Sequence, residues 1–173
     1  MIKIIICDDQ EVVCQGLNAI LSTGDDLQVV GIGNNGMDAI DLVKKHSPDV
    51  VQMDLKMPVM NGIHATKAIK EEHPDTKVLF FTTYDADAWL FDAIRKGAVG
   101  YLLKDTSRVK LINAIQEVKD GQTPLDSKVA GKLFNPLSRQ ALPADSKIGQ
   151  DLTERETEIL KAVSRGMTNA DIA

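Results

Sequence analysis

Five residues in this sequence have the types and positions needed for chemistry on a charged group. Asp8 and Asp9 follow an apolar run at residues 3–7, Asp54 follows the run at 49–53, Thr82 ends the run at 77–82 and Lys104 follows the run at 99–103. If these runs pair as parallel strands, their ends meet at one edge of the sheet, where doubly wound α/β proteins place their chemistry. We therefore expect three carboxylates, a hydroxyl and an ammonium group to converge there.

This set of side chains suits phosphoryl chemistry. Three carboxylates packed together repel one another, and a hard divalent cation such as Mg²⁺, which prefers oxygen ligands, supplies the compensating charge. In phosphoryl transfer the protein positions groups and neutralises charge, and a carboxylate can act as nucleophile by forming an acyl phosphate, so Asp54 is the candidate nucleophile. Taken singly, each aspartate could be a turn former and Lys104 a solvated surface lysine. The agreement of all four strand ends favours a site.

Alternating strands and helices are expected to position these residues. Short β-branched runs alternate with segments whose apolar residues recur at helical spacing as far as about residue 120, which is typical of βαβ units. With right-handed crossovers, five strands and five helices form a three-layer α/β sandwich. The expected strands are 3–7, 27–32, 49–53, 77–82 and 99–103, and the expected helices are 11–22, 36–46, 60–72, 87–96 and 107–120.

Length and composition indicate one domain of ordinary size plus a fragment. The chain has 173 residues, 43% of them hydrophobic, and a net charge of −5, which argues against a general nucleic-acid coat. No apolar run reaches the roughly 18 residues of a membrane span, and Asp8 interrupts the N-terminal run too early for a signal peptide. We expect a cytoplasmic protein with no membrane contact. Cys7 and Cys14 form no C-x-x-C pair and are expected to be reduced thiols.

On these residues the chain resembles a two-component response regulator, and residues 1–121 are similar to its receiver domain. The resemblance implies a flavodoxin-like (CheY-like) fold, a doubly wound five-stranded parallel sheet with strand order 2-1-3-4-5. The segments that carry it are Asp8-Asp9 after the first strand, Asp54-x-x-Met57-Pro58-x-x-x-Gly62, Thr82 after the fourth strand, and Gly100-Tyr101-Leu102-Leu103-Lys104.

The resemblance also implies roles for the residues at the sheet edge. Asp54 accepts a phosphoryl group from a sensor histidine kinase. Asp9, Asp54 and the backbone carbonyl of Lys56 bind Mg²⁺, and Asp8 assists through water. Lys104 pairs with the phosphoryl oxygens. The protein is then no enzyme in the ordinary sense but a phosphoacceptor that assists its own phosphotransfer and dephosphorylation with Mg²⁺.

A switch of conformation is implied in the same way. Thr82 donates a hydrogen bond to the phosphoryl group, Tyr101 takes the space that Thr82 leaves, and the face formed by the fourth helix, the fifth strand and the fifth helix changes shape. Alternatively, Tyr101 is only a half-buried strand aromatic. Lys56 and Tyr84, two residues beyond Asp54 and Thr82, occupy positions that tune dephosphorylation in this family.

The C-terminal part resembles the start of a LuxR/NarL-type helix-turn-helix domain. Residues 122–150 are expected to be a linker with a short helix, because prolines and small polar residues break any period there. In residues 151–173, Leu152-Thr-Glu-Arg-Glu156 forms a capping box before an apolar helix. The recognition helix, which would enter the major groove, is not among these residues, so the DNA-binding residues are unknown.

Two functions remain open for such a chain. The first is a transcription regulator that binds promoter DNA through the full-length output domain, controlled by phosphorylation and, as we expect, by homodimer formation. The alternative is a receiver that acts through protein contacts alone, without DNA binding.

A glycine pattern supports a third hypothesis, a nicotinamide-dependent oxidoreductase. Gly31-Ile-Gly33-Asn-Asn-Gly36 matches G-x-G-x-x-G, follows an expected strand and opens an expected helix. However, a βαβ unit precedes it, the remaining sheet is too short for two mononucleotide-binding halves, and Thr82 and Lys104 would have no role. A lone glycine fingerprint is weak evidence.

Overall fold

The computed structural model describes residues 1–24, 26–83 and 87–134, and for residues 87 and 132–134 it describes the backbone only. Three sequence predictions lie wholly or partly outside the described residues: the tuning role of Tyr84, the linker from residue 135 to 150, and the helix-turn-helix segment at 151–173. Residues Met1–Ala130 form one compact unit, which contains every element discussed below except the end of the last helix.

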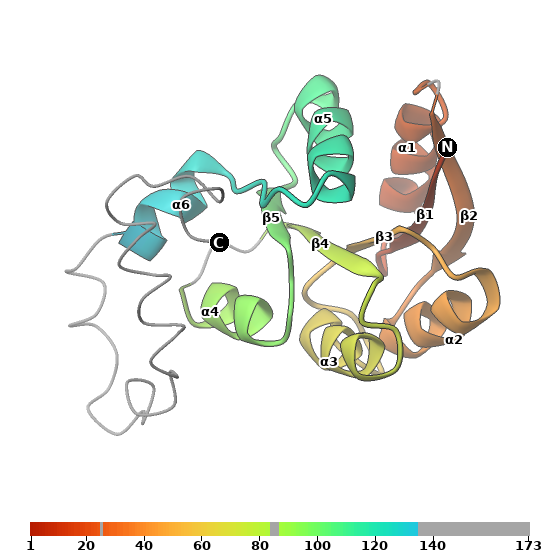
Figure 1. Ribbon diagram of the computed structural model, residues 1–173, viewed down its shortest axis with the longest axis horizontal. Helices are drawn as coiled ribbons and strands as arrows, with labels where there is room; N and C mark the ends of the chain where they lie inside the picture. The colour runs from red at the N-terminus through yellow and green to blue at the C-terminus, as the bar shows by residue number, and fades with distance from the viewer. Residues whose placement is uncertain (25, 84–86, 135–173) are drawn as a thin grey trace. The chain divides into compact units, whose positions relative to one another are not determined.

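A single parallel sheet of five strands lies at the centre of this unit (Figure 1). The strand order is β2-β1-β3-β4-β5, the order that the sequence predicts. The chain therefore starts in an inner strand, adds β2 at one edge, and then crosses β1 to build the other side of the sheet. The strands are β1 (Ile2–Cys7), β2 (Leu27–Gly33), β3 (Val50–Met53), β4 (Lys77–Thr82) and β5 (Gly100–Leu103).

Helices cover both faces of the sheet. In Figure 1, α1 and α5 lie on one side of the strands, and α2, α3 and α4 lie on the other. All five predicted helices are present, with ends within two residues of the expected positions. The helices are α1 (Glu11–Leu21), α2 (Gly36–His46), α3 (Gly62–Glu72), α4 (Asp87–Arg95), α5 (Arg108–Lys119) and a further short helix, α6 (Ser127–Phe134).

Capping residues explain where several helices begin. The Asn35 side chain accepts hydrogen bonds from the amides of Met37 and Asp38 at the start of α2. The prediction for α3 was two residues too early, because Asn61 is its N-cap and accepts from the His64 amide over 2.9 Å. Such side-chain caps satisfy amides that have no partner inside the helix.

The core is apolar on both faces of the sheet, and its central strands are buried. Every residue of β3 and β5 is buried, as expected for a parallel sheet covered on two sides. The layer beneath α1 and α5 forms one hydrophobic cluster, and each fully buried Ile or Leu side chain there contributes about 1.5–3 kcal/mol. Its most buried members are Ile4, Ile6, Leu21, Val50, Leu79, Leu102 and Ile115.

Four strand ends differ from the prediction by one residue, and the start of β3 is the one with a structural consequence. Asp49 was expected to begin the third strand, but β3 starts at Val50. The Asp49 carboxylate accepts a hydrogen bond from the Lys3 amide over 2.8 Å and pairs with Lys119 over 2.6 Å. This aspartate therefore lies at the opposite edge of the sheet from Asp54, where its side chain joins β1 to the end of α5.

Packing accounts for two glycines of the nucleotide-like pattern. A Cβ atom on Gly33 would lie 2.8 Å from Cβ of Asp38 and 3.0 Å from the sulfur of Cys7. A Cβ atom on Gly36 would lie 2.7 Å from the Met60 carbonyl oxygen, to which the Gly36 amide also donates a hydrogen bond. These positions exclude larger residues because neighbouring chain segments approach closely, so no bound dinucleotide is needed to explain them.

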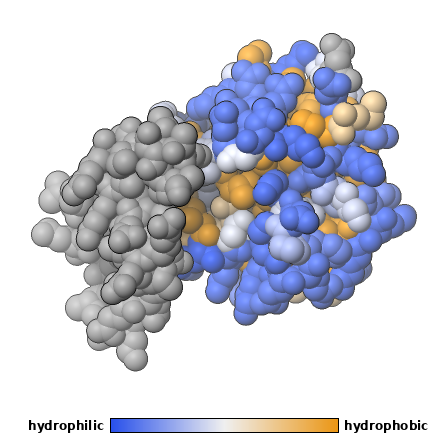
Figure 2. Space-filling model, in the orientation of Figure 1, coloured by the Kyte–Doolittle hydropathy of each residue, from blue (hydrophilic) through white to orange (hydrophobic). Residues whose placement is uncertain are grey.

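The surface is mainly hydrophilic on the face shown in Figure 2, with smaller hydrophobic patches between charged regions. Large exposed hydrophobic side chains include Val12 on α1 and Val109 on α5, at 82% and 67% exposure. Among the described residues, no helix combines the length and the apolar character needed to cross a membrane.

Gly62 provides a direct test of this packing. A Cβ atom there would overlap the carbonyl oxygen of Asp54 and lie 2.8 Å from the Met53 side chain. We expect Gly62→Ala to lower the free energy of unfolding by about 1–3 kcal/mol, as overpacking does, in urea denaturation monitored by circular dichroism. Gly16→Ala is the matched control, because open space surrounds Gly16 within α1 and alanine should stabilise that helix by about 0.5–1 kcal/mol. Equal effects of the two variants would contradict this account.

Candidate functional site: a carboxylate cluster at the sheet edge

The sheet brings the predicted residues together at the carboxyl ends of its strands. Backbone hydrogen bonds continue beyond the regular strands and fix this edge. The Asp8 amide donates to the Gly33 carbonyl over 3.1 Å, and the Asp54 amide donates to the Cys7 carbonyl over 2.8 Å. The Lys104 amide donates to the Thr82 carbonyl over 2.9 Å. Each functional residue is thus tied to the neighbouring strand.

Three carboxylates form the centre of the site. One carboxylate oxygen from each of Asp8, Asp9 and Asp54 lies within 4.8 Å of the other two. Asp8 and Asp54 are buried, at 0% and 3% exposure, whereas Asp9 is exposed. The cluster therefore has two fixed inner carboxylates and one that faces solvent. This confirms that the predicted strand ends converge.

Lys104 supplies positive charge to the inner pair. Its ammonium nitrogen lies 2.6 Å from Oδ2 of Asp8 and 3.5 Å from Oδ1 of Asp54, and its side chain is only 12% exposed. The interpretation of Lys104 as a solvated surface lysine is therefore wrong. Both contacts are ion pairs, and neither Oδ2 of Asp8 nor Oδ1 of Asp54 has a further hydrogen-bond partner among the described residues. One ammonium group therefore leaves acceptor capacity free on two buried carboxylates.

Burial and charge shift the pKa values of this pair. Burial raises the pKa of Asp54 above its ordinary value, although the Lys104 ammonium and a hydrogen bond from Thr82 oppose that rise. Burial by itself would lower the pKa of Lys104, but the contacts with Asp8 and Asp54 outweigh it and raise that pKa. Lys104 thus remains positively charged, while the Asp54 carboxylate is less stable in its charged form than an exposed one.

The donor set fits a hard divalent cation. Carboxylate oxygens are the ligands that Mg²⁺ prefers, and a cation would use the acceptor capacity that Lys104 leaves free on Asp8 and Asp54. Asp9 is exposed, so its carboxylate can complete such a site from the solvent side. Lys56, predicted to contribute its carbonyl oxygen, is exposed in the loop after β3, and its ammonium lies 5.5 Å from the ring centre of Trp89.

The two predicted switch residues are both fully buried. Thr82, the last residue of β4, and Tyr101, on β5, each have 0% exposure. The Tyr101 ring stacks on Phe80 with 5.8 Å between ring centres. The interpretation of Tyr101 as a half-buried strand aromatic is therefore wrong with respect to burial. The sheet is covered on both faces at β5. The burial of Tyr101 could have been predicted from the apolar sequence of that strand, which is typical of a strand buried on both faces.

The two cysteines are free, as predicted, and both are buried. Cys7 immediately precedes Asp8, and burial raises the pKa of its thiol to about 12. The Cys14 thiol lies 3.3 Å from the Asp8 carbonyl oxygen, to which it donates. Both sulfurs are protonated at neutral pH, so neither is a thiolate ligand or nucleophile beside the carboxylates.

One polar residue near the site was missed by the sequence analysis. Gln52 on β3 has 0% exposure, and neither atom of its amide has a hydrogen-bond partner among the described residues. It lies two residues before Asp54, and its register partners are Ile6 and Leu79. The visible signal was a single amide within the otherwise apolar sequence Val50-Val51-Gln52-Met53.

Comparisons with known proteins agree with this geometry. Residues 4–116 match the family of the response regulator receiver domain. The transcriptional regulatory protein LnrK from Bacillus subtilis is 38% identical over 179 residues, which cover 100% of this chain and 81% of LnrK. The signal receiver domain of the response regulator NarL from Mycobacterium tuberculosis has a TM-score of 0.68 at 31% identity, covering 70% of this chain and 98% of that one. A DNA-binding response regulator of the LuxR family from Staphylococcus aureus has a TM-score of 0.66 at 28% identity. That match covers 69% of this chain and 99% of the other.

The raised pKa of Asp54 predicts how stability depends on pH. The native state holds this proton more tightly than the unfolded chain, so the contribution of Asp54 to stability decreases as pH rises above the ordinary carboxyl pKa. We expect Asp54→Asn to stabilise the protein at pH 7 and to have little effect near pH 4, by thermal unfolding in metal-free buffer.

Asp49 provides a control of opposite sign. Burial would raise its pKa, but Lys119 and the Lys3 amide lower it below the ordinary value. Its contribution is therefore present at neutral pH and lost as pH falls through the lowered pKa. Asp49→Asn should destabilise the protein at pH 7 and progressively less in acid. A pH-independent effect of Asp54→Asn would contradict the assigned pKa shift.

Proposed function

Because this chain belongs to the response regulators of two-component signalling, through a receiver domain at residues 4–116, we propose that Asp54 is its phosphoacceptor, that a sensor histidine kinase supplies the phosphoryl group, and that the modification controls transcription. One observation carries the assignment. Asp54 is buried, the Lys104 ammonium contacts both its carboxylate and that of Asp8, and one Asp54 oxygen accepts no hydrogen bond among the described residues.

The neighbouring residues have distinct roles in this proposal. A carboxylate oxygen of Asp54 attacks the phosphorus, the bond to the kinase histidine breaks, and an acyl phosphate forms. Lys104 pairs with the phosphoryl oxygens, which it can reach because its ammonium is already 3.5 Å from Asp54. Thr82 donates a hydrogen bond to the phosphoryl group, and Tyr101 moves into the space that Thr82 leaves.

Asp9, Asp54 and the carbonyl oxygen of Lys56 would hold Mg²⁺, and Asp8 would assist through water. When bound, the cation neutralises charge on the transferring phosphoryl group. The inner carboxylates provide the fixed half of this site, and the solvent-facing Asp9 provides the other. The protein assists its own dephosphorylation at the same site, and Lys56 and Tyr84 tune the rate.

The output of the switch is proposed to be DNA binding. LnrK is named a transcriptional regulatory protein, and the Staphylococcus aureus neighbour is described as a DNA-binding response regulator of the LuxR family. By analogy, residues 1–121 form the receiver, 122–150 the linker and 151–173 the first part of a helix-turn-helix domain. Phosphorylation favours a homodimer, and promoter DNA binds through the full-length output domain. The cytoplasmic location stays a prediction.

Intact mass spectrometry tests the phosphoacceptor. After incubation with acetyl phosphate and Mg²⁺, we expect the wild-type chain to gain one phosphoryl group and Asp54→Ala to gain none. Asp49→Asn is the matched control, since it removes an aspartate at the opposite edge of the sheet and should be labelled like the wild type. Labelling that survives in Asp54→Ala would refute the assignment.

The metal site has a separate test that needs no phosphorylation. If Mg²⁺ binds only the native state, thermal stability should rise with its concentration, by about 2.7 kcal/mol at 100 times the dissociation constant. We expect Asp9→Ala, a change at an exposed position, to lose most of this response. Lys56→Ala retains the backbone carbonyl and should respond like the wild type. A response that persists in Asp9→Ala would exclude that residue as a ligand.

A further inference from the structure

The segment that follows α5 lies along the outer edge of β5 and pairs with it through one isolated bridge. We name residues Pro124–Lys128 the edge strap. The Tyr101 amide donates to the Pro124 carbonyl over 3.0 Å, and the Asp126 amide donates to the Tyr101 carbonyl over 2.9 Å. An isolated parallel bridge joins Tyr101 to Leu125. The backbone of the proposed switch residue is thus bonded to the segment through which the chain leaves the receiver.

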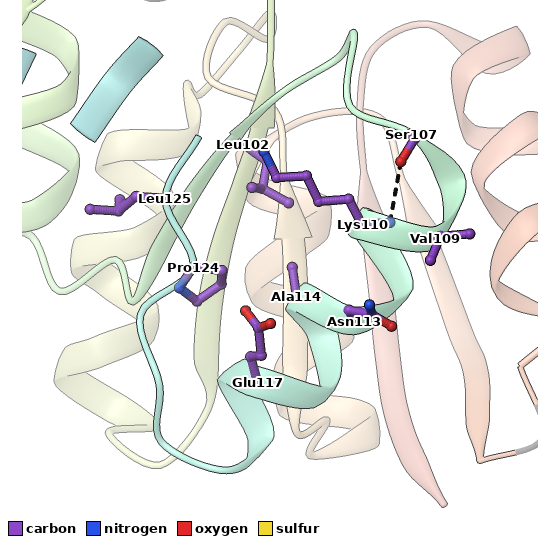
Figure 3. Close-up of a pocket in the computed structure, with 9 residues that line it drawn as sticks. All are labelled: Leu102, Ser107, Val109, Lys110, Asn113, Ala114, Glu117, Pro124 and Leu125. Carbon is purple, nitrogen blue, oxygen red and sulfur yellow. Dashed lines mark hydrogen bonds between the residues drawn. The ribbon is translucent and has the colours of Figure 1, made fainter. Parts of the chain in front are cut away.

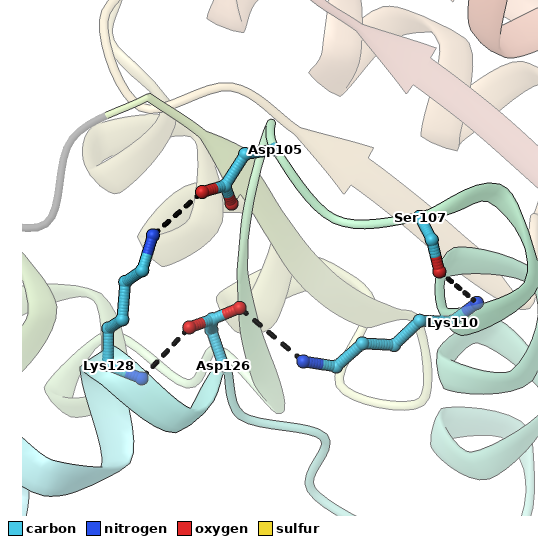
Figure 4. Close-up of polar contacts among 5 residues, drawn as sticks. All are labelled: Asp105, Ser107, Lys110, Asp126 and Lys128. Carbon is cyan, nitrogen blue, oxygen red and sulfur yellow. Dashed lines mark hydrogen bonds and ion pairs between the residues drawn. The ribbon is translucent and has the colours of Figure 1, made fainter.

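Asp126 anchors the edge strap from inside. Its carboxylate is only 8% exposed, accepts the Lys128 amide over 2.9 Å and pairs with Lys110 on α5 over 3.4 Å (Figure 4). Its carbonyl oxygen accepts the Ala130 amide over 2.8 Å. One residue therefore caps α6 and also binds that helix to α5 and β5. A buried carboxylate requires such partners, because burial without them is costly.

The edge strap also reaches the turn that carries Lys104. The next residue, Asp105, pairs with Lys128 over 2.7 Å (Figure 4). Both side chains are more than 60% exposed, so this pair contributes little energy. The pair matters because of its position. Lys104 in this turn contacts the carboxylate cluster, and the adjacent Asp105 contacts the edge strap. The turn is short and closed by a hydrogen bond from the Thr106 amide to the Leu103 carbonyl over 2.9 Å.

A groove separates part of the edge strap from α5. Pro124 and Leu125 line one side, and Lys110, Ala114 and Glu117 of α5 line the other, with Leu102 of β5 at its base (Figure 3). The polar contacts described above that hold the edge strap are two backbone bonds to Tyr101, the bonds of the Asp126 carboxylate and the exposed pair of Lys128 with Asp105. A segment held by a small number of bonds can shift without disruption of the core.

We propose that the edge strap couples phosphorylation to α6: it is docked while Lys104 pairs with Asp8, and it loosens when a phosphoryl group on Asp54 draws Lys104 and Tyr101 to new positions. This inference rests on the proposed function of Asp54. The physical reason is that the edge strap shares its contacts with the two residues that must move. Tyr101 makes both backbone hydrogen bonds that join the edge strap to β5. Asp105, which pairs with Lys128 of the edge strap, is the residue next to Lys104.

Hydrogen exchange of the whole chain tests the coupling. We expect treatment with acetyl phosphate and Mg²⁺ to accelerate exchange of the Tyr101, Asp126 and Ala130 amides about fivefold or more, with little change in β1 and β3. Intact mass is measured on the same samples. Absence of a phosphoryl group would refute the proposed function, whereas a phosphorylated chain with unchanged exchange at these amides would refute the edge strap alone.

Reciprocity supplies a second test that does not depend on phosphotransfer rates. If the phosphorylated state loosens the edge strap, a variant with a loosened strap must bind a phosphoryl mimic more tightly by the same factor. We expect Asp126→Ala to bind beryllofluoride about fivefold or more tightly in calorimetry with Mg²⁺.

Two further variants separate capping from charge. Asp126→Asn retains helix capping, since asparagine is an equally good N-cap, but weakens the pair with Lys110, and it should give an intermediate affinity. Asp120→Asn changes an exposed aspartate at the end of α5 and should bind like the wild type. Unchanged affinity in Asp126→Ala, with normal unfolding of that variant, would overturn the proposal.

Discussion

The repulsion among three carboxylates at one sheet edge is the constraint on which the rest of the structure depends. Two of them are buried, so their charge cannot be screened by water and must be balanced locally. Lys104 balances part of it, and backbone bonds between neighbouring strands prevent the edge from spreading. The fold holds an unfavourable arrangement of negative charge at this edge, which a cation would relieve and which added negative charge would aggravate. A site of this kind responds strongly to a change in charge.

The two ends of the sheet use aspartate in opposite ways. Asp49, at the amino-terminal edge, has complementary partners in Lys119 and the Lys3 amide, and they lower its pKa. Asp54, at the other edge, has too few partners for its degree of burial, and its pKa is raised. The Asp49 carboxylate stabilises the native state at neutral pH, whereas the Asp54 carboxylate reduces its stability there. The same residue type is structural or functional according to its surroundings.

Sequence reasoning predicted the sheet order, the helices and the convergence of Asp8, Asp9, Asp54 and Lys104, because parallel strands place their ends together and apolar periodicity marks each element. It did not predict the features that depend on contacts between distant segments. Packing across the sheet produces the complete burial of Tyr101 and the pairing of Leu125 with β5, and it leaves the Gln52 amide without a hydrogen-bond partner in the part of the chain that the structure describes. The start of α3 was predicted at the apolar residue Met60, but the helix begins at Gly62, because the side chain of Asn61 caps it.

The pairing of Leu125 with β5 bears on how receivers can be joined to new output modules. A chimera cut at the end of α5 would lose both backbone bonds to Tyr101 and the cap that Asp126 gives α6. It would also expose the edge of β5, and unpaired strand edges invite association with other chains. A junction placed after Ala130 keeps the compact unit and its edge covered. The natural unit of transfer is therefore the receiver together with the first turn of α6.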